Sequence, residues 1–157
     1  MYRFAITLTV VALAGCNTAQ TRDVNSPYYK VPIGSEIIVN KDLDIPEGQA
    51  HISLQDGMLT TGVGNYNVSC TFNVRNLGPA TIKAGSFTVR ETGPGQEWVS
   101  QPSIMRFYRQ FRFTPDSQPD VLNFICQDWD GPMLGRPISV PEMRKAVGDY
   151  VSFKFAQ

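Results

Sequence analysis

The stretch Val68-Ser69-Cys70-Thr71-Phe72-Asn73-Val74-Arg75 decides the fold class. Apolar and polar side chains alternate along it without a break, so one set faces a core and the other faces solvent. A period of two is typical of a half-buried β-strand. Cys70 belongs to the apolar set and is therefore expected to point into the core.

The same period recurs on both sides of this strand. Strands are expected over residues 36–40, 49–55, 58–61, 66–75, 81–90, 103–113, 121–127 and 150–155. Asp56-Gly57 is typical of a type I′ hairpin turn, because both residues tolerate a positive φ. Gly85 interrupts the alternation and predicts a β-bulge, and Gly93-Pro94-Gly95 predicts a loop over residues 91–97.

One helix is expected near the C-terminus. Ser139-Val140-Pro141-Glu142 has the form of a capping box, in which Ser139 and Glu142 satisfy each other's backbone N–H groups. An apolar helical face follows, and Gly148 suits the position after the helix end. Many short antiparallel strands and one short C-terminal helix predict a mainly β chain, folded as an antiparallel β-sandwich or a small barrel.

The N-terminus has a different pattern from the rest of the chain. Arg3 precedes an apolar segment, residues 4–14, that is too short to span a bilayer, which takes about 20 apolar residues. Together with the small residues that follow, this indicates a secretory signal peptide. Leu13-Ala14-Gly15-Cys16 resembles the lipobox of bacterial lipoproteins. An ordinary cleaved signal peptide and an N-terminal anchor helix stay open as alternatives.

The lipobox resemblance implies an address in the cell envelope. It implies that residues 1–15 are removed and that Cys16 becomes the lipidated first residue, with acyl chains such as palmitate in the lipid bilayer. Several chains are needed for stable anchoring, since each buried CH₂ contributes only about 0.8 kcal/mol. Asn17 stands where lipoproteins retained in the inner membrane of many Gram-negative bacteria carry aspartate. The resemblance therefore implies the outer membrane, with the inner leaflet favoured over the cell surface.

The rest of the mature chain divides into two parts. Residues 16–35 are polar, contain Pro27 and Pro32, and are expected to form a flexible tether. Residues 36–157 are expected to form a single β-domain, since their number suits one core. The whole chain holds 14 basic and 14 acidic residues. This balance provides no field of one sign that would attract nucleic acid.

The cysteine count fits an oxidising periplasm. Lipidation of Cys16 leaves Cys70 and Cys126, which are expected to form a disulfide. Leu122, Phe124 and Cys126 share one strand face, so both cysteines point inward and can meet within a sheet or between sheets. Two unpaired buried thiols are the alternative. A redox-active pair has less support, because there is no Cys-x-x-Cys motif.

Few residues stand in patterns that carry chemistry. His51, the single histidine, falls on the polar side of its strand, where a histidine is usually solvated. Spacing leaves a Ser-His-Asp site open, but no Gly-x-Ser-x-Gly elbow frames a serine. Asp128-Trp129-Asp130-Gly131 is similar to the start of a calcium loop but lacks the further ligands. A turn with Trp129 in the core is expected there instead, and no cofactor is expected.

The strongest candidate for a binding face lies between residues 106 and 113. Arg106, Tyr108, Gln110 and Arg112 fall on one face of the strand. Arginines with an interleaved tyrosine can bind phosphate, carboxylate or a sugar face, so Arg106, Tyr108 and Arg112 are the candidate binding residues. The same pattern fits an ordinary half-buried strand whose charged face is solvated, and we favour that interpretation. Arg109 intrudes on the apolar face. It is expected either to reach a sheet margin or to pair with a buried carboxylate.

The whole pattern resembles small gammaproteobacterial lipoproteins of unassigned function. The resemblance covers the lipobox, the tether, residues 45–50 and the strand around Cys70, and it supplies no catalytic residue. The anchor, the tether and the lack of catalytic groups favour a non-enzymatic envelope protein that binds an envelope protein or a glycan. The alternatives are an inhibitor or scavenger that binds a foreign enzyme or a small anion, and a small hydrolase that uses His51.

Overall fold

A computed structural model describes residues 21–114 and 118–157 of the chain. The predicted signal peptide, Cys16 and Asn17 lie outside the described residues. The elements follow in the order β1 (Glu36–Val39), β2 (Leu43–Ile45), β3 (His51–Gln55), β4 (Met58–Thr60), β5 (Ser69–Val74), β6 (Ala80–Ile82), β7 (Gly85–Ser100), β8 (Ile104–Phe113), β9 (Val121–Asp130), α1 (Val140–Val147), the 3₁₀ turn Gly148–Tyr150 and β10 (Val151–Lys154).

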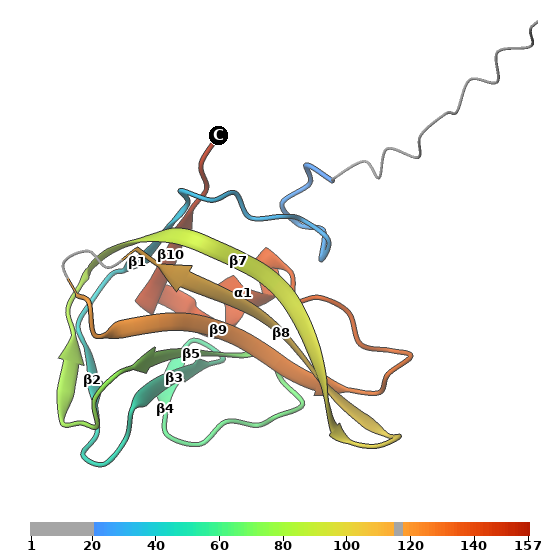
Figure 1. Ribbon diagram of the computed structural model, residues 1–157, viewed down its shortest axis with the longest axis horizontal. Coiled ribbons are helices and arrows are strands. Elements are labelled where there is room, and N and C mark those ends of the chain that lie inside the picture. Colours follow the sequence, from blue (N-terminus) through green and yellow to red (C-terminus); the bar gives the residue numbers. More distant parts are fainter. Residues whose placement is uncertain (1–20, 115–117) are drawn as a thin grey trace, which may run out of the picture.

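One curled antiparallel sheet dominates the fold (Figure 1). Its eight strands are ordered β10-β1-β7-β8-β9-β5-β3-β4, and β2 and β6 form a separate two-stranded sheet. The large sheet bends into a half-barrel, and α1 packs on its concave face against β3, β5 and β10. The prediction of a mainly β, antiparallel chain with one short C-terminal helix is confirmed. With eight residues, α1 is too short to cross a bilayer, and it is the one α-helix of the described residues.

The core lies between the concave face and α1. Its largest fully buried side chains include Phe72, Phe111 and Phe124. The rings of Phe72 and Phe124 stand 4.5 Å apart, centroid to centroid. Burying one such ring contributes about 2 to 3 kcal/mol, so this aromatic cluster stabilises the centre of the sheet.

The predicted disulfide joins two neighbouring strands of this core. Cys70 on β5 lies directly opposite Cys126 on β9, with their Cα atoms 4.0 Å apart. Both residues are fully buried. The prediction is therefore confirmed, and the pair lies within one sheet. The expected inward position of Leu122 is wrong: its side chain is exposed and Val121 is buried instead, because the register shifts by one residue where Val121 pairs with Val74.

Two predicted local motifs are confirmed. Asp56 and Gly57 have φ values of 51° and 77° in the β3–β4 turn, as a type I′ turn requires. Ser139 caps α1, and its backbone N–H donates to the Glu142 carboxylate at 2.9 Å. The Gly57 N–H donates to the Ala146 carbonyl at 3.0 Å, which ties the edge of the sheet to the helix. Gly148 has a φ of 53°, and a Cβ there would stand 2.7 Å from the Gly57 Cα, so this approach requires glycine.

The prediction of a loop over residues 91–97 is wrong. Strand β7 runs unbroken from Gly85 to Ser100 and pairs with β8 through Gly93-Pro94-Gly95. Strand β1 pairs with β7 as far as Thr88, and Val89 bonds to the backbone of Gly34 and Ser35. Beyond Val89, β7 is an edge strand, where the missing N–H of a proline is tolerated. The bulge expected at Gly85 also lies elsewhere: the register shifts between Val89 and Glu91.

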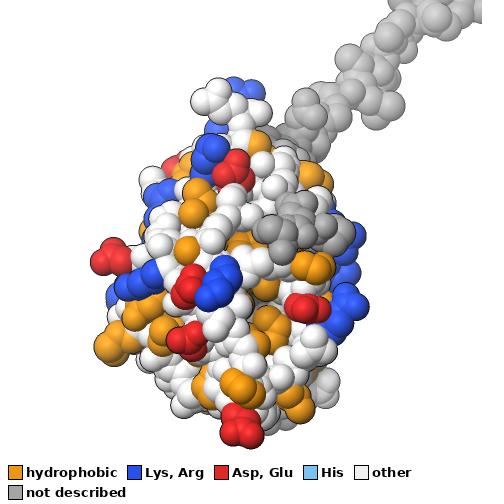
Figure 2. Space-filling model, turned by 90° about the vertical axis from the view of Figure 1, so that its left-hand side faces the viewer, with side chains coloured by type: hydrophobic (Ala, Val, Ile, Leu, Met, Phe, Trp, Pro, Cys, Tyr) orange, Lys and Arg blue, Asp and Glu red, His pale blue; other side chains and the backbone are white. Residues whose placement is uncertain are grey.

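The alternation of apolar and polar residues did not predict β2 and β6, which lie at one end of the molecule. Strand β2 has three residues, too few to show a period, and the expected strand 81–90 is divided between β6 and β7. Asp42 fixes this division, since it accepts from the Ala84 N–H and pairs with Lys83 at 2.8 Å. Figure 2 shows this end of the molecule, with basic and acidic side chains interspersed over it.

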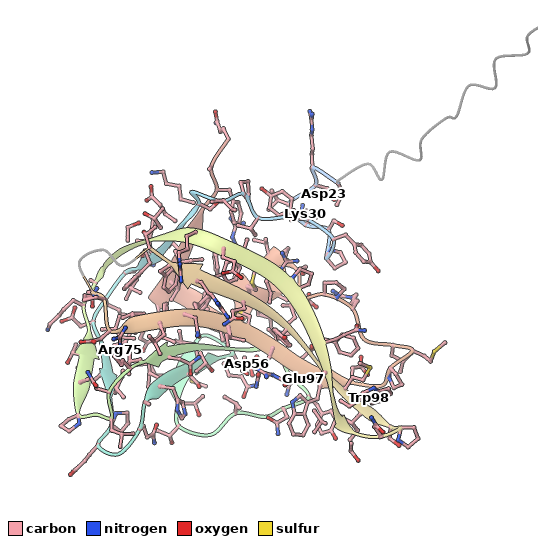
Figure 3. All side chains as sticks on the ribbon, in the orientation of Figure 1. Asp23, Lys30, Asp56, Arg75, Glu97 and Trp98 are labelled. Atoms are coloured by element: carbon pink, nitrogen blue, oxygen red, sulfur yellow. A yellow bond between two sulfur atoms is a disulfide. The ribbon has the colours of Figure 1, made fainter. Side chains whose placement is uncertain are left out.

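The described part of the predicted tether packs on the domain. Val31 and Ser35 are buried, and the ring of Tyr29 packs edge-on against Phe155 at 5.5 Å. Asp23 and Lys30 mark this segment above the sheet in Figure 3. The expectation of a flexible tether is therefore corrected for residues 27–35. The partners in these contacts lie on β8 and near the C-terminus, far from this segment in the sequence.

Candidate functional site

The convex face of the sheet is mostly polar. It is open to solvent at Glu91 and Arg112, whereas Ser53 and Ser69 on the β3 and β5 side are buried. The residues of this face, called the convex face below, form cross-strand rows from β3 through β5, β9 and β8 to β7. The rows are His51-Asn73-Asn123-Arg112-Glu91, Ser53-Thr71-Ile125-Gln110-Gly93 and Gln55-Ser69-Gln127-Tyr108-Gly95. On the β3, β5 and β9 side the polar groups bond to one another, as in the contact of 2.8 Å between the hydroxyls of Ser53 and Thr71.

A hollow lies on the β7–β8 side of this face. It holds about 190 Å³, and it is lined by Glu91, Thr92, Gly93, Pro94, Tyr108, Gln110 and Arg112. We call it the Tyr108 hollow. Gly93 accounts for it, because a Cβ at this position would meet no atom within 4 Å. The missing side chain thus leaves space between the Gly95–Tyr108 pair and the Glu91–Arg112 pair of the ladder.

The Tyr108 ring is held by two neighbours and also lines the hollow. It lies over the backbone of Gly95, where a Cβ would come within 2.3 Å of Cζ. The Arg106 guanidinium stands 4.9 Å from the ring centroid. Arg106 is itself held by Glu97, at 2.7 Å, and by Gln127. Tyr108 lines the hollow beside Gln110 and Arg112, and we call the part of its ring that does so the open face.

The polar groups around the hollow keep hydrogen-bonding capacity. Within residues 21–114 and 118–157, neither the Tyr108 hydroxyl nor the Gln110 amide has a protein partner. Arg112 approaches Glu91 only to 3.7 Å, and their side chains are 49% and 63% exposed. Such a pair contributes little to stability. The guanidinium and the carboxylate can therefore both turn to a ligand.

The predicted binding residues have separate roles. Tyr108 and Arg112 come together at the hollow, whereas Arg106 lies outside it and supports the tyrosine ring. The end of β7 that carries Glu97, the partner of Arg106, is marked in Figure 3. The sequence placed Gln110 on the same face as Tyr108 and Arg112, but it did not indicate Gly93 as part of the site, because the pairing of β7 with β8 was not expected there.

Arg109 takes neither of the two expected positions. It is buried on the concave face, and its guanidinium donates to three backbone carbonyls: Ile138 at 3.1 Å, Tyr29 at 2.9 Å and Pro27 at 3.0 Å. Burial lowers the pKa of Arg109, but an arginine keeps its charge in proteins. Three backbone carbonyl dipoles thus take the place of the buried carboxylate that was expected. Through these bonds Arg109 holds the N-terminal segment on the domain.

A second hollow lies beside α1 on the concave side. It holds about 250 Å³, and its lining includes Asp56, Tyr66, Asp128, Glu142 and Lys145. Burial raises the pKa of Asp128 to about 6, and the negative charges of Glu142 and Asp130 add to this effect. The Oδ1 atom of Asp128 is buried and has no hydrogen-bond partner among the described residues.

The sequence predicted a turn over residues 128–131, next to this hollow, with Trp129 in the core. Asp128, Trp129 and Asp130 belong to β9 and not to a turn, and Trp129 is half-buried on the convex side, where its ring packs against Tyr66. The prediction that Trp129 lies in the core is therefore wrong. In the part of the chain that the structure describes, no group of three or more His, Cys, Asp or Glu side chains could hold a metal ion.

Glu142 has a structural role at the start of α1. Burial works to raise the pKa of Glu142, but hydrogen bonds from Arg136 and Ser139 outweigh it and lower that pKa. The Arg136 guanidinium binds both carboxylate oxygens, at 2.7 and 2.9 Å. The carboxylate also accepts from the Ser139 hydroxyl at 2.6 Å. Glu142 therefore secures the start of α1 beside the second hollow.

The chain matches no protein-family model, no curated protein and no solved structure. What the two hollows bind has to be inferred from their own residues. The Tyr108 hollow combines an open aromatic face with polar groups that have no partner among the described residues. At the second hollow, Glu142 is already paired and the Asp128 Oδ1 atom is sealed from solvent. The Tyr108 hollow is therefore the candidate binding site.

Proposed function

We propose that the chain is a membrane-anchored envelope lipoprotein whose non-catalytic β-domain binds another component of the envelope. The Tyr108 hollow carries this proposal. It presents the open face of Tyr108, the Gln110 amide and the loosely paired Arg112 on the part of the convex face that is open to solvent. Unpaired polar groups beside an accessible aromatic ring are typical of a binding surface.

The anchor rests on the N-terminal sequence. Leu13-Ala14-Gly15-Cys16 supports lipidation of Cys16, and Asn17 supports the outer membrane, with the inner leaflet favoured. The Cys70–Cys126 disulfide supports the same compartment, because such bonds persist in oxidising environments. Since the chain is already held at Pro27, the residues from Cys16 to that point span at most about 40 Å. The domain would therefore work close to the bilayer.

The surroundings of His51 support a non-catalytic domain. His51 lies on the convex face opposite Asn73, whose amide donates to Asn123. Among the described residues, no hydrogen bond joins the imidazole to a serine or a carboxylate. A triad needs both of those contacts. We expect cells that produce the His51→Ala variant to have the same phenotype as cells that produce the wild-type protein.

Mass spectrometry of the N-terminal peptide tests the anchor. We expect a triacyl mass on Cys16 and recovery of the protein in the outer-membrane fraction. In a Cys16→Ala variant, the acyl mass should disappear and the domain should leave that fraction. An N-terminal peptide that begins at another residue, or a Cys16 without acyl chains, would contradict the anchor.

Capture from solubilised envelope tests the binding. The tagged full-length chain should retain an envelope component, and Tyr108→Ala/Arg112→Ala should lose it. Arg75→Ala is the matched control, since Arg75 is an exposed arginine at the far end of β5 (Figure 3). Equal capture by all three proteins would show that the Tyr108 hollow is not the site. Capture by none of them would count against the proposed function.

A further inference from the structure

The electrostatics of the Tyr108 hollow favour a ligand without net charge. Arg112 faces Glu91 across the ladder, and Arg106, on the far side of Tyr108, is paired with Glu97. Each arginine on this part of the convex face thus has an acidic residue directly opposite. A phosphate or a carboxylate would meet the Glu91 carboxylate as well as the Arg112 guanidinium, so a free anion has little to gain there.

The shape of the hollow favours one ring of a longer ligand. Its volume of about 190 Å³ is below the range of cavities that enclose a whole drug-sized molecule, roughly 300 to 1,000 Å³. Gly93 forms its floor and the open face of Tyr108 forms one wall. A flat ring can therefore lie against the tyrosine while the remainder of the ligand extends over the sheet.

The polar groups suit a ring that carries hydroxyls on its edge. Gln110 offers an amide donor and acceptor, Arg112 offers parallel N–H donors, and Glu91 offers carboxylate acceptors. These three planar groups can each bond two adjacent hydroxyls. The Tyr108 hydroxyl adds a further donor and acceptor. A sugar ring combines an apolar C–H face for the aromatic wall with such an edge of hydroxyls.

We infer that the Tyr108 hollow binds one ring of a saccharide chain, which stacks on Tyr108 and bonds to Gln110, Arg112 and Glu91. This rests on the proposed function, since it names the chemical class of the envelope component. A protein partner is the competing class. Such a partner would add a strand to the free edge of β7 beyond Val89, and it would not need the hollow.

Calorimetric titration of the full-length lipidated chain in detergent tests the inference. The probes are the tetramer of β-1,4-linked N-acetylglucosamine, cellotetraose, maltotetraose and inorganic phosphate. We expect at least one saccharide to bind and phosphate neither to bind nor to compete. Tyr108→Ala should weaken the binding by about tenfold or more, whereas Tyr108→Phe, which keeps the ring, should remain within about threefold.

A second variant removes the hollow without removing a polar group. Gly93→Val fills the space above the floor, where a Cβ meets nothing within 4 Å, and valine suits a strand. We expect it to weaken saccharide binding by about tenfold or more. This test remains valid if the Tyr108→Ala variant does not fold. Arg75→Ala should bind as the wild type does.

The outcomes separate the inference from the proposed function. Binding of no saccharide by the wild type, or binding that Gly93→Val leaves unchanged, would overturn the inference. Phosphate binding that depends on Arg112 but not on Tyr108 would also overturn it. If envelope capture still depends on Tyr108 and Arg112 in that case, the proposed function stands without the saccharide. Saccharide binding without capture of any envelope component would leave the ligand class standing and remove the envelope function.

Discussion

Two of the three arginines on strand β8, Arg109 and Arg112, lie three residues apart and differ in burial and in bonding partners. Arg109 lies on the concave face, is buried, and bonds three backbone carbonyls. Arg112 lies on the convex face, is half exposed, and has Glu91 at 3.7 Å as its one ion-pair partner among the described residues. Both belong to the same run of sequence. The difference shows that the concave side uses Arg109 and the disulfide for stability, whereas the β7–β8 part of the convex side leaves its polar groups available.

The largest effect should come from the concave disulfide. Replacement of both Cys70 and Cys126 by alanine opens a link across a sequence separation of 56 residues. We expect a loss of about 4 kcal/mol in the free energy of unfolding, measured by urea denaturation. Thr71→Val, on the same strand but on the convex face, should cost only about 1 kcal/mol through its lost hydroxyl bond to Ser53. Similar losses for both variants would break the contrast between the faces.

Arg109→Ala should give the next largest loss, about 2 to 4 kcal/mol. It leaves the carbonyls of Pro27, Tyr29 and Ile138 without their donor. Residues 21–35 should then detach, and trypsin should cleave after Lys30 faster than in the wild type. If the free energy of unfolding of the variant lies within about 0.5 kcal/mol of the wild-type value, and trypsin cleaves both proteins at the same rate, then Arg109 does not hold this segment.

Asp128 provides a pH-dependent test of the concave face. Its folded pKa of about 6 lies above the ordinary value of 3.8, so the folded state binds the proton more tightly than the unfolded state. The resulting stability is present below about pH 4 and is lost as the pH rises through about 6. The full change corresponds to about 3 kcal/mol, and partial exposure should reduce it to about 1 kcal/mol.

Unfolding experiments at pH 4.5 and pH 8 measure this effect. Asp128→Asn should remove the decrease between the two conditions and be more stable than the wild type at pH 8. Asp120→Asn is the control and should keep the decrease, because Asp120 is exposed and does not act on the pKa of Asp128. If Asp128→Asn shows the same pH dependence as the wild type, another group is responsible.

The smallest effect on stability should come from the convex face. Arg112→Ala loses a long, exposed ion pair with Glu91, and its free energy of unfolding should change by less than about 0.5 kcal/mol. The same variant should nevertheless weaken capture of the envelope component. A stability loss as large as that of Arg109→Ala would show that Arg112 has a structural role.

Local pattern predicted the parts of the fold that depend on neighbouring residues. The alternation from Val68 to Arg75 and that around Phe124 gave the inward faces of β5 and β9, and hence the disulfide. Asp56-Gly57 predicted the turn, and Ser139 with Glu142 predicted the helix start. Each of these features depends on residues at most four positions apart, whose local preferences do not require the remainder of the chain.

The candidate site was predictable only in part. Tyr108 and Arg112 share a face by alternation, so the sequence indicated both. Gln110 lies between them on the same face of β8, so alternation indicated it as well. Gly93 joins them because β7 pairs with β8 through a segment that contains two glycines and a proline. Local propensity favours a loop there. The pairing is possible because β1 ends and leaves β7 with a free edge on its other side.

Local sequence was enough to establish the strand period, the faces of β5 and β8, and the residues that can bond at close range. The packing of distant segments brings Arg109 to carbonyls from residues 27, 29 and 138, and it leaves Arg112 half exposed beside Glu91. These two kinds of feature differ because the interactions behind them act over different ranges of sequence. Alternation is a property of adjacent residues, whereas burial and the supply of hydrogen-bond partners depend on segments that are distant in the chain.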